Sequence, residues 1–467
     1  MELVGTDNAI PLRVAIVGSG PAAFYAADRL LKQAGLKVEI DMFERFPTPY
    51  GLVRTGVAPD HQKIKSVTKK FAEIASNPRF RFYGLVEFGK DIVVSDLREH
   101  YHQILYATGA QADKRIGIPG EELKGIHAAN EFIGWYNGHP DYRDCQFDLF
   151  QERVAIVGMG NVAVDVARIL CLTPDELAVT DIASHALGAL SQSRIKEVYL
   201  LGRRGPAQAA FTNPEIKELG NLADADIFVL PDEAQLDDSS RAALDASDDR
   251  VTRQKVEILQ GYASRKPAGR TRQLSIRFMV SPVDFLGNTT GQVVAMRLVK
   301  NALYQTEAGT LKSKATDRVE ELPTDLVFRS VGYRGTPLPE VPFNERWGVI
   351  LNEKGRVVDP ESQQPVVGEY CSGWIKRGPT GVIGTNKLDS VETVNCMLVD
   401  LAHGSILRPS EPAGSKAEHL VRKRQPNYFS FADWLRLDAM EVKIGRAQGR
   451  PREKFTRVED MLAALGR

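Results

Sequence analysis

Two stretches of the chain repeat one pattern of apolar and small residues. Residues 13–17 and 153–157 both have the sequence RVAIV, a mostly apolar, β-branched run that predicts a buried strand. After each run, two glycines and an alanine follow in the spacing G-x-G-x-x-A: Gly18, Gly20 and Ala23, then Gly158, Gly160 and Ala163. Residues rich in alanine and valine come next and predict a helix. The pattern therefore predicts two strand–turn–helix units of the type that binds dinucleotides.

Each residue type in these turns has a physical role. The first glycine allows the tight turn, and the second lets a pyrophosphate approach the backbone because no Cβ is in the way. The alanine is small enough for the helix to lie against its strand. The free N–H groups at the start of the helix then face the phosphate oxygens. The alternative is a glycine-containing turn that binds no ligand.

The two units differ where their second strand ends. Residues 37–42 predict a strand that leads to Glu44, where a carboxylate hydrogen-bonds a ribose 2′-OH and repels a 2′-phosphate. The corresponding strand of the second unit, residues 197–201, is followed by Arg203 and Arg204, and guanidinium groups bind phosphate bidentately. The first unit is therefore predicted to take FAD or NAD, and the second NADP(H). A solvated acid and a surface arginine pair are the alternatives.

Length and charge limit the possible classes of protein. The chain has 467 residues with 60 Lys+Arg and 60 Asp+Glu, so its formal net charge is zero. This length predicts two or three domains, and the balanced charge gives no reason to expect a nucleic-acid partner. No stretch is apolar over the length that spans a bilayer, and the N-terminus lacks the features of a secretory signal. We therefore expect a cytoplasmic protein with no membrane or nucleic-acid partner.

The cysteines argue against one class of flavin enzyme. The four of them form neither C-x-x-C nor any metal-ligand spacing: Cys145, Cys171, Cys371 and Cys396. Flavoenzymes that reduce disulfides relay electrons through a close cysteine pair, and iron–sulfur clusters need clustered cysteines. We expect these cysteines to be small buried residues, and we predict no metal site.

An irregular loop follows the first unit. Residues 48–65 are rich in glycine and proline before they become helical, and such a loop between a strand and a helix is often functional. His61 in this loop is a candidate proton carrier or neighbour of a nicotinamide, with helix capping or packing as the alternative. The lysines in and after the loop predict a basic, solvated helix face: Lys63, Lys65, Lys69 and Lys70.

Four further segments carry weaker patterns. Residues 121–151 predict a linker with short helices, and residues 224–250 predict an acidic surface excursion with one short helix. A sparse basic run at residues 265–277 is either a docking surface for an acidic partner or a solvated face. Residues 373–386 form a glycine-rich loop before a helix at 387–401, whose N-terminus is suited to stabilise negative charge on a flavin ring.

The chain resembles the adrenodoxin-reductase-like ferredoxin–NADP⁺ reductases, and most closely their bacterial NADPH–ferredoxin reductases, in five motifs: GSGPAAFYAA, PYGLVRTGVAPDHQKIK, GMGNVAVDVARIL, GRRGPAQAAFT and GWIKRGPTGVIGTN. The resemblance covers nearly the whole chain, including a charged, helical tail in which we identify no chemistry. It implies an α/β fold of two Rossmann-like dinucleotide-binding domains. The NADP(H)-binding domain, residues 113–332, is inserted into a discontinuous FAD-binding domain, residues 1–112 and 333–467.

The resemblance also implies specific contacts. FAD is expected against residues from both parts of its domain: Gly18, Gly20, Ala22, Ala23, Glu44, Leu52, Val86, Trp374, Gly381, Val382 and Ile383. NADP(H) is expected mainly against the second unit: Lys114, Met159, Gly160, Asn161, Val162, Arg203, Arg204, Glu215 and Gly381. His61 and Glu218 match positions close to the flavin and the nicotinamide. The segment after Glu218 is acidic, which leaves the docking surface of the partner open.

The implied function is electron transfer. NADPH delivers a hydride to flavin N5, and single electrons pass to a ferredoxin-type iron–sulfur protein. We find no fused ferredoxin domain and expect a separate partner protein. One alternative is an NADPH-dependent flavin diaphorase, oxidase or monooxygenase with a small-molecule acceptor, although no F-x-G-x-x-x-H fingerprint is present. Another is a non-enzymatic, nucleotide-binding redox sensor.

Overall fold

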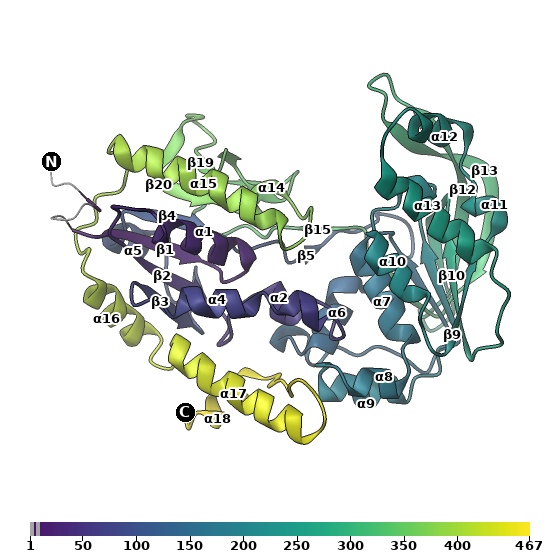
Figure 1. The fold of residues 1–467 in the computed structure, drawn as a ribbon, viewed down its shortest axis with the longest axis horizontal. Coiled ribbons are helices and arrows are strands. Elements are labelled where there is room, and N and C mark those ends of the chain that lie inside the picture. Colours follow the sequence, from purple (N-terminus) through teal and green to yellow (C-terminus); the bar gives the residue numbers. More distant parts are fainter. Residues whose placement is uncertain (1–3, 6–9) are drawn as a thin grey trace.

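A computed structural model describes residues 4–5 and 10–467. The two repeats of RVAIV form the central strands of two different sheets (Figure 1). The strand β1, Leu12–Val17, is buried at all six positions, as expected for a parallel strand that is covered on both faces. Arg13 is the charged exception, and its guanidinium pairs with Glu39 at 2.8 Å and Asp41 at 2.6 Å.

Among the described residues, the first sheet has seven strands. Their order is β18 (Asn352–Glu353), β19 (Arg356–Val358), β20 (Pro365–Cys371), β4 (Gln103–Tyr106), β1, β2 (Val38–Glu44) and β3 (Phe80–Gly84). The strands from β20 to β3 run parallel, whereas β18 and β19 form an antiparallel edge. The sheet is therefore assembled from the two ends of the chain.

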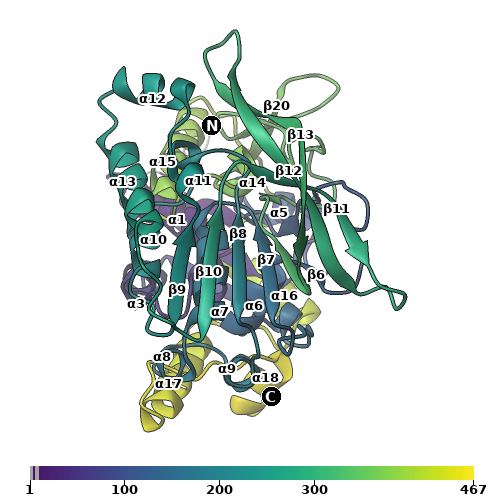
Figure 2. The same ribbon diagram turned by 90° about the vertical axis from the view of Figure 1, so that its right-hand side faces the viewer.

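The second sheet, again among the described residues, has six parallel strands, which Figure 2 shows largely side by side. Their order is β6 (Ile126–Ala128), β14 (Leu326–Arg329), β7 (Arg153–Val157), β8 (Glu197–Leu201), β10 (Arg272–Arg277) and β9 (Ala225–Val229). A third, antiparallel sheet extends from this unit: β11 (Val280–Gly287), β12 (Val293–Gln305) and β13 (Leu311–Pro323). All of these strands lie between the two parts of the first sheet in sequence.

Helices surround both sheets. With the first sheet are α1 (Pro21–Leu31), α2 (Leu52–Thr55), α3 (Gln62–Lys65), α4 (Thr68–Ala75), α5 (Val94–His100), α14 (Trp374–Arg377), α15 (Thr385–Ala402), α16 (Gly414–Arg424), α17 (Phe431–Ala447) and α18 (Val458–Ala464). With the second are α6 (Ala129–Asn137), α7 (Asn161–Cys171), α8 (Pro174–Ala178), α9 (Ser184–Ser191), α10 (Asn213–Leu219), α11 (Pro231–Ala234), α12 (Asp238–Asp245) and α13 (Arg250–Ala263). No helix in the described residues combines the length and apolarity that a membrane span requires.

The chain crosses between the two sheets twice, at one place. The short strands β5 (Ala112–Asp113) and β15 (Tyr333–Arg334) pair antiparallel and lie between the sheets in Figure 1. We call the first sheet with its helices the first unit, and the second and third sheets with their helices the second unit. The strand β5 carries the chain out of the first unit, and β15 brings it back. The predicted architecture of one α/β unit inserted into another is therefore the observed one.

The charged tail forms a second connection. After α17 the tail lies beside α8 and α9 of the second unit, in the lower part of Figure 1. The buried Arg450 donates hydrogen bonds to the carbonyl oxygens of Thr180, at 3.2 Å, and Ile182. Arg143 donates to the hydroxyl of Thr456 at 3.1 Å. The tail was expected to carry no chemistry, and its observed role is to bind the two units together.

Two segments differ from the sequence expectation. Residues 121–151 were predicted to be a linker with short helices; they contain such a helix, α6, but its aromatic residues Phe132, Trp135 and Tyr136 are buried in the core of the second unit, and the edge strand β6 was not expected. Residues 224–250 were predicted to be a surface excursion, but they contain the edge strand β9. In both cases a short strand is stabilised by its neighbour in the sheet rather than by a long apolar run.

Candidate active site

The two glycine turns have the same geometry at their first glycine. Gly18 has φ +99°, and a Cβ built on it would lie 2.6 Å from the carbonyl oxygen of Ala107. Gly158 has φ +147°, and its added Cβ would lie 2.2 Å from the carbonyl oxygen of Ser330. Because a side chain would collide with the neighbouring strand connection, both positions require glycine.

The second glycine of each turn faces open space. A Cβ added to Gly20 or to Gly160 would meet no atom within 4 Å among the described residues. These two glycines precede the first residues of α1 and α7, and in the described chain no side chain caps either helix N-terminus. The first N–H groups of both helices are therefore left for a ligand, which is the arrangement that holds a pyrophosphate. Both turns fit a dinucleotide.

Glu44 lies beside the first turn and is fixed by hydrogen bonds. Its carboxylate accepts from the hydroxyl of Ser19 at 2.7 Å and from the N–H of Phe46 at 3.2 Å. Burial raises the pKa of Glu44, and these hydrogen bonds act in the opposite direction. The N–H of Val86 donates to the carbonyl oxygen of Glu44 at 2.9 Å, so the main chain at Val86 reaches the same corner. Glu44 is thus a positioned acceptor rather than a solvated acid.

The turn after β8 carries the arginine pair. Arg203 is exposed and Arg204 is half-buried, and neither forms an ion pair with a carboxylate in the described part of the chain. Burial lowers the pKa of Arg204, and the charge of Arg203 lowers it further. Two adjacent cations without an acidic partner form a site that an anion would stabilise.

Residues at the start of α7 connect this turn to the rest of the second unit. The carbonyl oxygen of Met159 accepts from the N–H groups of Ala210 and Phe211 at 2.9 and 3.1 Å. The side-chain oxygen of Asn161 accepts from the N–H of Thr212 at 2.8 Å. Val162 packs against the hydrophobic core. The glycine turn, the arginine turn and the start of α10 are therefore held as one structure.

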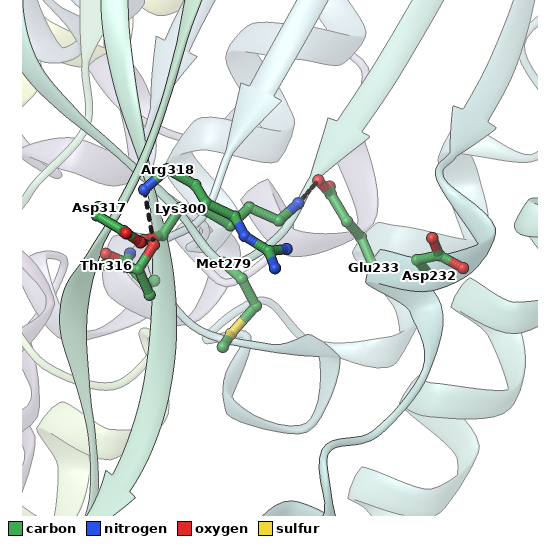
Figure 3. Close-up of a pocket in the computed structure, with 8 residues that line it drawn as sticks. Asp232, Glu233, Met279, Lys300, Thr316, Asp317 and Arg318 are labelled. Atoms are coloured by element: carbon green, nitrogen blue, oxygen red, sulfur yellow. Dashed lines mark hydrogen bonds and ion pairs between the residues drawn. The ribbon is translucent and has the colours of Figure 1, made fainter.

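A cavity of about 410 Å³ adjoins the arginine turn. Its lining, shown in Figure 3, comes from α11, from the segment between β10 and β11, and from β12 and β13 of the third sheet: Asp232, Glu233, Met279, Lys300, Asn301, Thr316, Asp317 and Arg318. The N–H of Met279 donates to the carbonyl oxygen of Arg204 at 3.2 Å, and the side-chain amide of Asn301 donates to that of Arg203 at 2.9 Å. The cavity thus lies next to the turn at the carboxyl end of the parallel strands, where ligands bind in such sheets.

The loop with His61 meets the second unit at α10. The Nε2 atom of His61 lies 2.8 Å from a carboxylate oxygen of Glu218 and 3.7 Å from one of Glu215. The side chains of His61 and Glu215 are about one-tenth exposed, whereas that of Glu218 is 43% exposed. Burial raises the pKa of Glu215, and the charge of Asp165 raises it further. His61, Glu215 and Glu218, all predicted site residues, are brought together here.

The distances within this cluster would also suit a metal ion. Side-chain ligand atoms of His61, Asp165 and Glu215 lie within 4.8 Å of one another. However, the guanidinium of Arg168 lies 2.8 Å from Asp165 and 3.3 Å from Glu215. Because this fixed cation is already paired with both carboxylates, the cluster is better described as an arginine-centred ion-pair network.

The remaining predicted flavin residues lie around the start of α15. Trp374 stacks against Tyr333 with ring centroids 6.1 Å apart, and its indole N–H donates to the carbonyl oxygen of Thr380 at 3.2 Å. Gly381 has φ +78°, and a Cβ there would lie 2.6 Å from the side chain of Thr385. Val382 is 56% exposed, so this loop presents its backbone at the surface before the helix begins.

Four predicted residues have other surroundings. Ala22 is buried, and a Cβ added to Gly373 would lie 2.7 Å from its methyl group, which places the loop before α14 against α1. Leu52 is 46% exposed, and Ile383 packs against the core of the first unit. Lys114 is exposed on the crossover, where its N–H donates to Gly332 at 3.1 Å.

One expectation about charge is wrong. Lys65 was predicted to be solvated, but it is buried and pairs with Asp181 of the second unit at 2.6 Å. In the basic run at 265–277, Arg277 pairs with Glu233 at 3.0 Å and Glu320 at 2.7 Å, whereas Arg265, Lys266 and Arg270 are exposed. The exposed part of the run is consistent with a solvated face.

Sequence reasoning missed Asp60 and Arg168. The carboxylate of Asp60 accepts two hydrogen bonds from Arg168 at 2.8 and 3.1 Å. Burial acts to raise the pKa of Asp60, but the nearby guanidinium outweighs it and holds that pKa below its ordinary value. A signal was available, because Asp165 and Arg168 form a charged pair at i, i+3 within an otherwise apolar helix.

Comparisons with known proteins agree with this geometry. Residues 12–200 match the model of the family described as pyridine nucleotide-disulphide oxidoreductase. The chain is 45% identical over 464 residues to the NADPH-ferredoxin reductase FprA of Mycobacterium tuberculosis, covering 97% of this chain and 98% of that protein. It is 41% identical to the mitochondrial NADPH:adrenodoxin oxidoreductase of Arabidopsis thaliana, covering 97% of this chain and 95% of the relative.

A longer relative and a solved structure extend the comparison. A probable ferredoxin/ferredoxin–NADP reductase of Mycobacterium bovis is 46% identical over 462 residues, and these cover 97% of this chain and 76% of that protein. The structure of Mycobacterium tuberculosis FprA in complex with NADPH is similar with a TM-score of 0.92 and 43% identity, covering 98% of this chain and all of the other. The likeness therefore includes both units and the way they are connected.

Proposed function

The chain belongs to the adrenodoxin-reductase-like ferredoxin–NADP⁺ reductases, and from this premise we propose how its two units carry out one reaction. It is an FAD-dependent ferredoxin–NADP⁺ reductase with NADP(H) as its second nucleotide. A hydride passes between NADPH and FAD, and single electrons pass between FAD and a ferredoxin-type iron–sulfur protein. Bound FAD supplies the ability to take up two electrons together and release them singly.

The contact between His61 and Glu218 is the observation that carries this proposal. His61 follows the first nucleotide unit, and Glu218 belongs to the helix α10 of the second unit. Their side chains approach to 2.8 Å, so the loops beside the two glycine turns meet at one point. Hydride transfer needs its two nucleotides in contact, and it depends on positioning more than on acid–base groups. We assign His61 and Glu218 to this meeting point as residues that modulate the transfer.

We assign FAD to the first turn and NADP(H) to the second. Glu44 accepts a hydrogen bond from the ribose hydroxyl of FAD, and the open space beside Gly20 holds the pyrophosphate of FAD. The space beside Gly160 holds the pyrophosphate of NADP(H). The guanidinium groups of Arg203 and Arg204, which form no ion pair with a carboxylate in the described chain, bind the 2′-phosphate. The other predicted contact residues stay with these assignments, with Lys114 the least supported because it lies on the crossover.

Domain boundaries, partner and location complete the proposal. We place the boundaries at 112/113 and 332/333, where β5 and β15 pair. We propose a separate ferredoxin-type protein as partner, and neither a membrane nor a nucleic acid. We also propose a cytoplasmic location, which the four free cysteines support because disulfides are rare there.

The test is anaerobic stopped-flow absorbance of the purified protein. The yellow flavin is expected to bleach quickly with NADPH and slowly with NADH, and to regain its colour when an oxidised ferredoxin is added. Protein that contains no FAD, or that NADPH does not reduce, would refute the assignment. If colour returns equally fast with air or a small quinone, the protein is a diaphorase or oxidase with a small-molecule acceptor.

A further inference from the structure

A single buried guanidinium connects the two units at the candidate active site. Arg168 projects from α7, the helix that begins at the second glycine turn, and its side chain is only 3% exposed. It lies within ion-pair distance of four carboxylates: Asp165 at 2.8 Å, Asp60 at 2.8 Å, Glu215 at 3.3 Å and Glu218 at 3.4 Å. One side chain thus contacts the first unit, its own helix and α10.

These contacts include both sides of the His61–Glu218 pair. Asp60 directly precedes His61, so the two hydrogen bonds from Arg168 to Asp60 fix the backbone from which the imidazole projects. The carboxylate oxygen of Glu218 that lies 3.4 Å from Arg168 is the same oxygen that lies 2.8 Å from His61. Arg168 therefore fixes each partner independently of the hydrogen bond between them.

The charge balance of the cluster also depends on Arg168. Four carboxylates face one guanidinium and one imidazole, and the buried hydroxyl of Tyr136 from α6 lies beside Asp165 without a hydrogen-bond partner among the described residues. Burial raises the pKa of Asp165, while Arg168 opposes this rise. Without the guanidinium, the carboxylates would repel one another and the cluster would bind protons more readily.

We propose that Arg168 is a positioning residue for hydride transfer, one that holds His61 and Glu218 in register across the two units. This inference rests on the proposed function. Among the described residues Arg168 contacts neither nucleotide turn, and of its four carboxylate partners only Glu215 is a predicted NADP(H) contact. Its effect should therefore fall mainly on the rate of the hydride step, with a smaller change in the affinity for NADP(H).

The experiment compares Arg168→Gln and Arg168→Lys with the wild-type holoenzyme. For Arg168→Gln we expect the limiting rate of flavin reduction by NADPH to fall roughly 10- to 100-fold, the scale of a small misplacement of reacting groups. The Kd for NADP⁺, measured by difference absorbance, should change far less. The pH profile of the limiting rate should shift to higher pH, and Arg168→Lys should restore part of the rate because it keeps the charge.

Two further variants separate positioning from folding. Asp60→Asn leaves Arg168 and the α10 carboxylates in place and removes the charge and one of the two hydrogen bonds that connect Arg168 to the His61 loop, so it should slow reduction in the same direction. If Arg168→Gln does not retain FAD, the rate of flavin reduction in Asp60→Asn decides whether this network positions His61. Arg153→Gln is the matched control, because Arg153 pairs bidentately with Asp325 at 2.9 and 3.0 Å on the same strand–helix unit.

The outcomes are distinct. Wild-type rate and pH profile in folded Arg168→Gln and Asp60→Asn would overturn the inference and leave the proposed function intact. An equal slowing in Arg153→Gln would also overturn it, because the effect would then be a general loss of stability. Failure of NADPH to reduce the wild-type flavin would instead refute the proposed function itself.

Discussion

At the scale of single residues, the two nucleotide turns are distinguished by charge. Glu44 accepts two hydrogen bonds and has no cation among its hydrogen-bond partners in the described chain, so a neutral donor such as a ribose hydroxyl suits its corner. Arg203 and Arg204 have the opposite environment, with two cations and no carboxylate partner in the described residues. Such a pair is stable only in solvent or with a bound anion.

The first prediction concerns these two arginines. Arg203→Ala and Arg204→Ala should each raise the KM for NADPH strongly and the KM for NADH little. A lost hydrogen bond to a charged group costs about 1.5–3 kcal/mol, which is roughly a 10- to 100-fold change. The measurement is steady-state reduction of a dye or ferredoxin with each nucleotide.

The control for this pair is Arg241→Ala, on the exposed helix α12. It removes a positive charge from the same unit without touching the turn after β8, and both KM values should stay at their wild-type level. Equal losses with NADPH and NADH in the Arg203 or Arg204 variant would show that these side chains do not recognise the 2′-phosphate.

At the scale of elements, the repeated strand–turn–helix unit could be predicted almost completely. Continuous apolar runs identify β1 and β7 because both strands are buried in the middle of a parallel sheet. The strand β9 was missed because acids surround its five residues and hide the alternating burial. The strand β6 has only three residues, so no periodicity could reveal it.

Contacts between distant elements are the part of the candidate site that could not be predicted from the sequence. The positions of Glu44, Arg203 and Arg204 at the end of a strand could be predicted from local pattern, and their contacts with the nucleotides stay predictions. The pairing of Asp60 with Arg168 joins residues 108 positions apart, and that of Lys65 with Asp181 joins residues 116 apart. Such pairs depend on how the two units are placed relative to each other. A local sequence pattern gives no information on that placement.

The second prediction concerns the second glycine of each turn. Gly160→Ala should fold with a normal Tm, because its new methyl group meets no atom within 4 Å. The methyl group would occupy the space of the pyrophosphate, and overpacking of this kind costs about 1–3 kcal/mol. The Kd for NADP⁺ should therefore rise roughly 5- to 100-fold while the FAD content stays unchanged. Gly20→Ala should show the reverse, a loss of FAD.

A third open glycine provides the control. Gly188 lies in the exposed helix α9, and a Cβ there also meets no atom within 4 Å among the described residues. Gly188→Ala should leave both nucleotides unaffected and raise the Tm slightly, since alanine is the better helix former. Normal NADP⁺ binding by Gly160→Ala would mean that the pyrophosphate does not approach this turn.

At the scale of the whole molecule, contacts in several places hold the two units together. The crossover of β5 and β15 is the covalent connection, and the Arg168 network is the polar connection at the candidate active site. The tail adds a contact through Arg450, and Lys65 adds one through its pair with Asp181. Because Asp60 and Lys65 lie on either side of His61 in the sequence, the relative position of the two units determines the surroundings of His61.

Acid should weaken the whole fold through one buried and three half-buried histidines, which lie in both units. Burial lowers the pKa of each to about 4: His102, His127, His139 and His185. The unfolded chain takes up protons on these side chains near pH 6.5, whereas the folded chain does so only near pH 4. The unfolded state therefore binds more protons between these values, and the free energy of unfolding should fall as the pH falls from about 6.5 to 4.

His127 offers the sharpest test of this pH dependence. It packs edge-on against Phe147 with ring centroids 4.9 Å apart and lies 6.1 Å from Phe328, so His127→Phe keeps the aromatic contacts and removes the titration. Each pKa unit corresponds to about 1.4 kcal/mol, and the variant should therefore lose roughly 3 kcal/mol less than wild type between pH 6.5 and 4. Urea unfolding across this range measures it, with the exposed His403→Gln as control. A parallel pH dependence in wild type and His127→Phe would show that His127 does not contribute to the acid sensitivity.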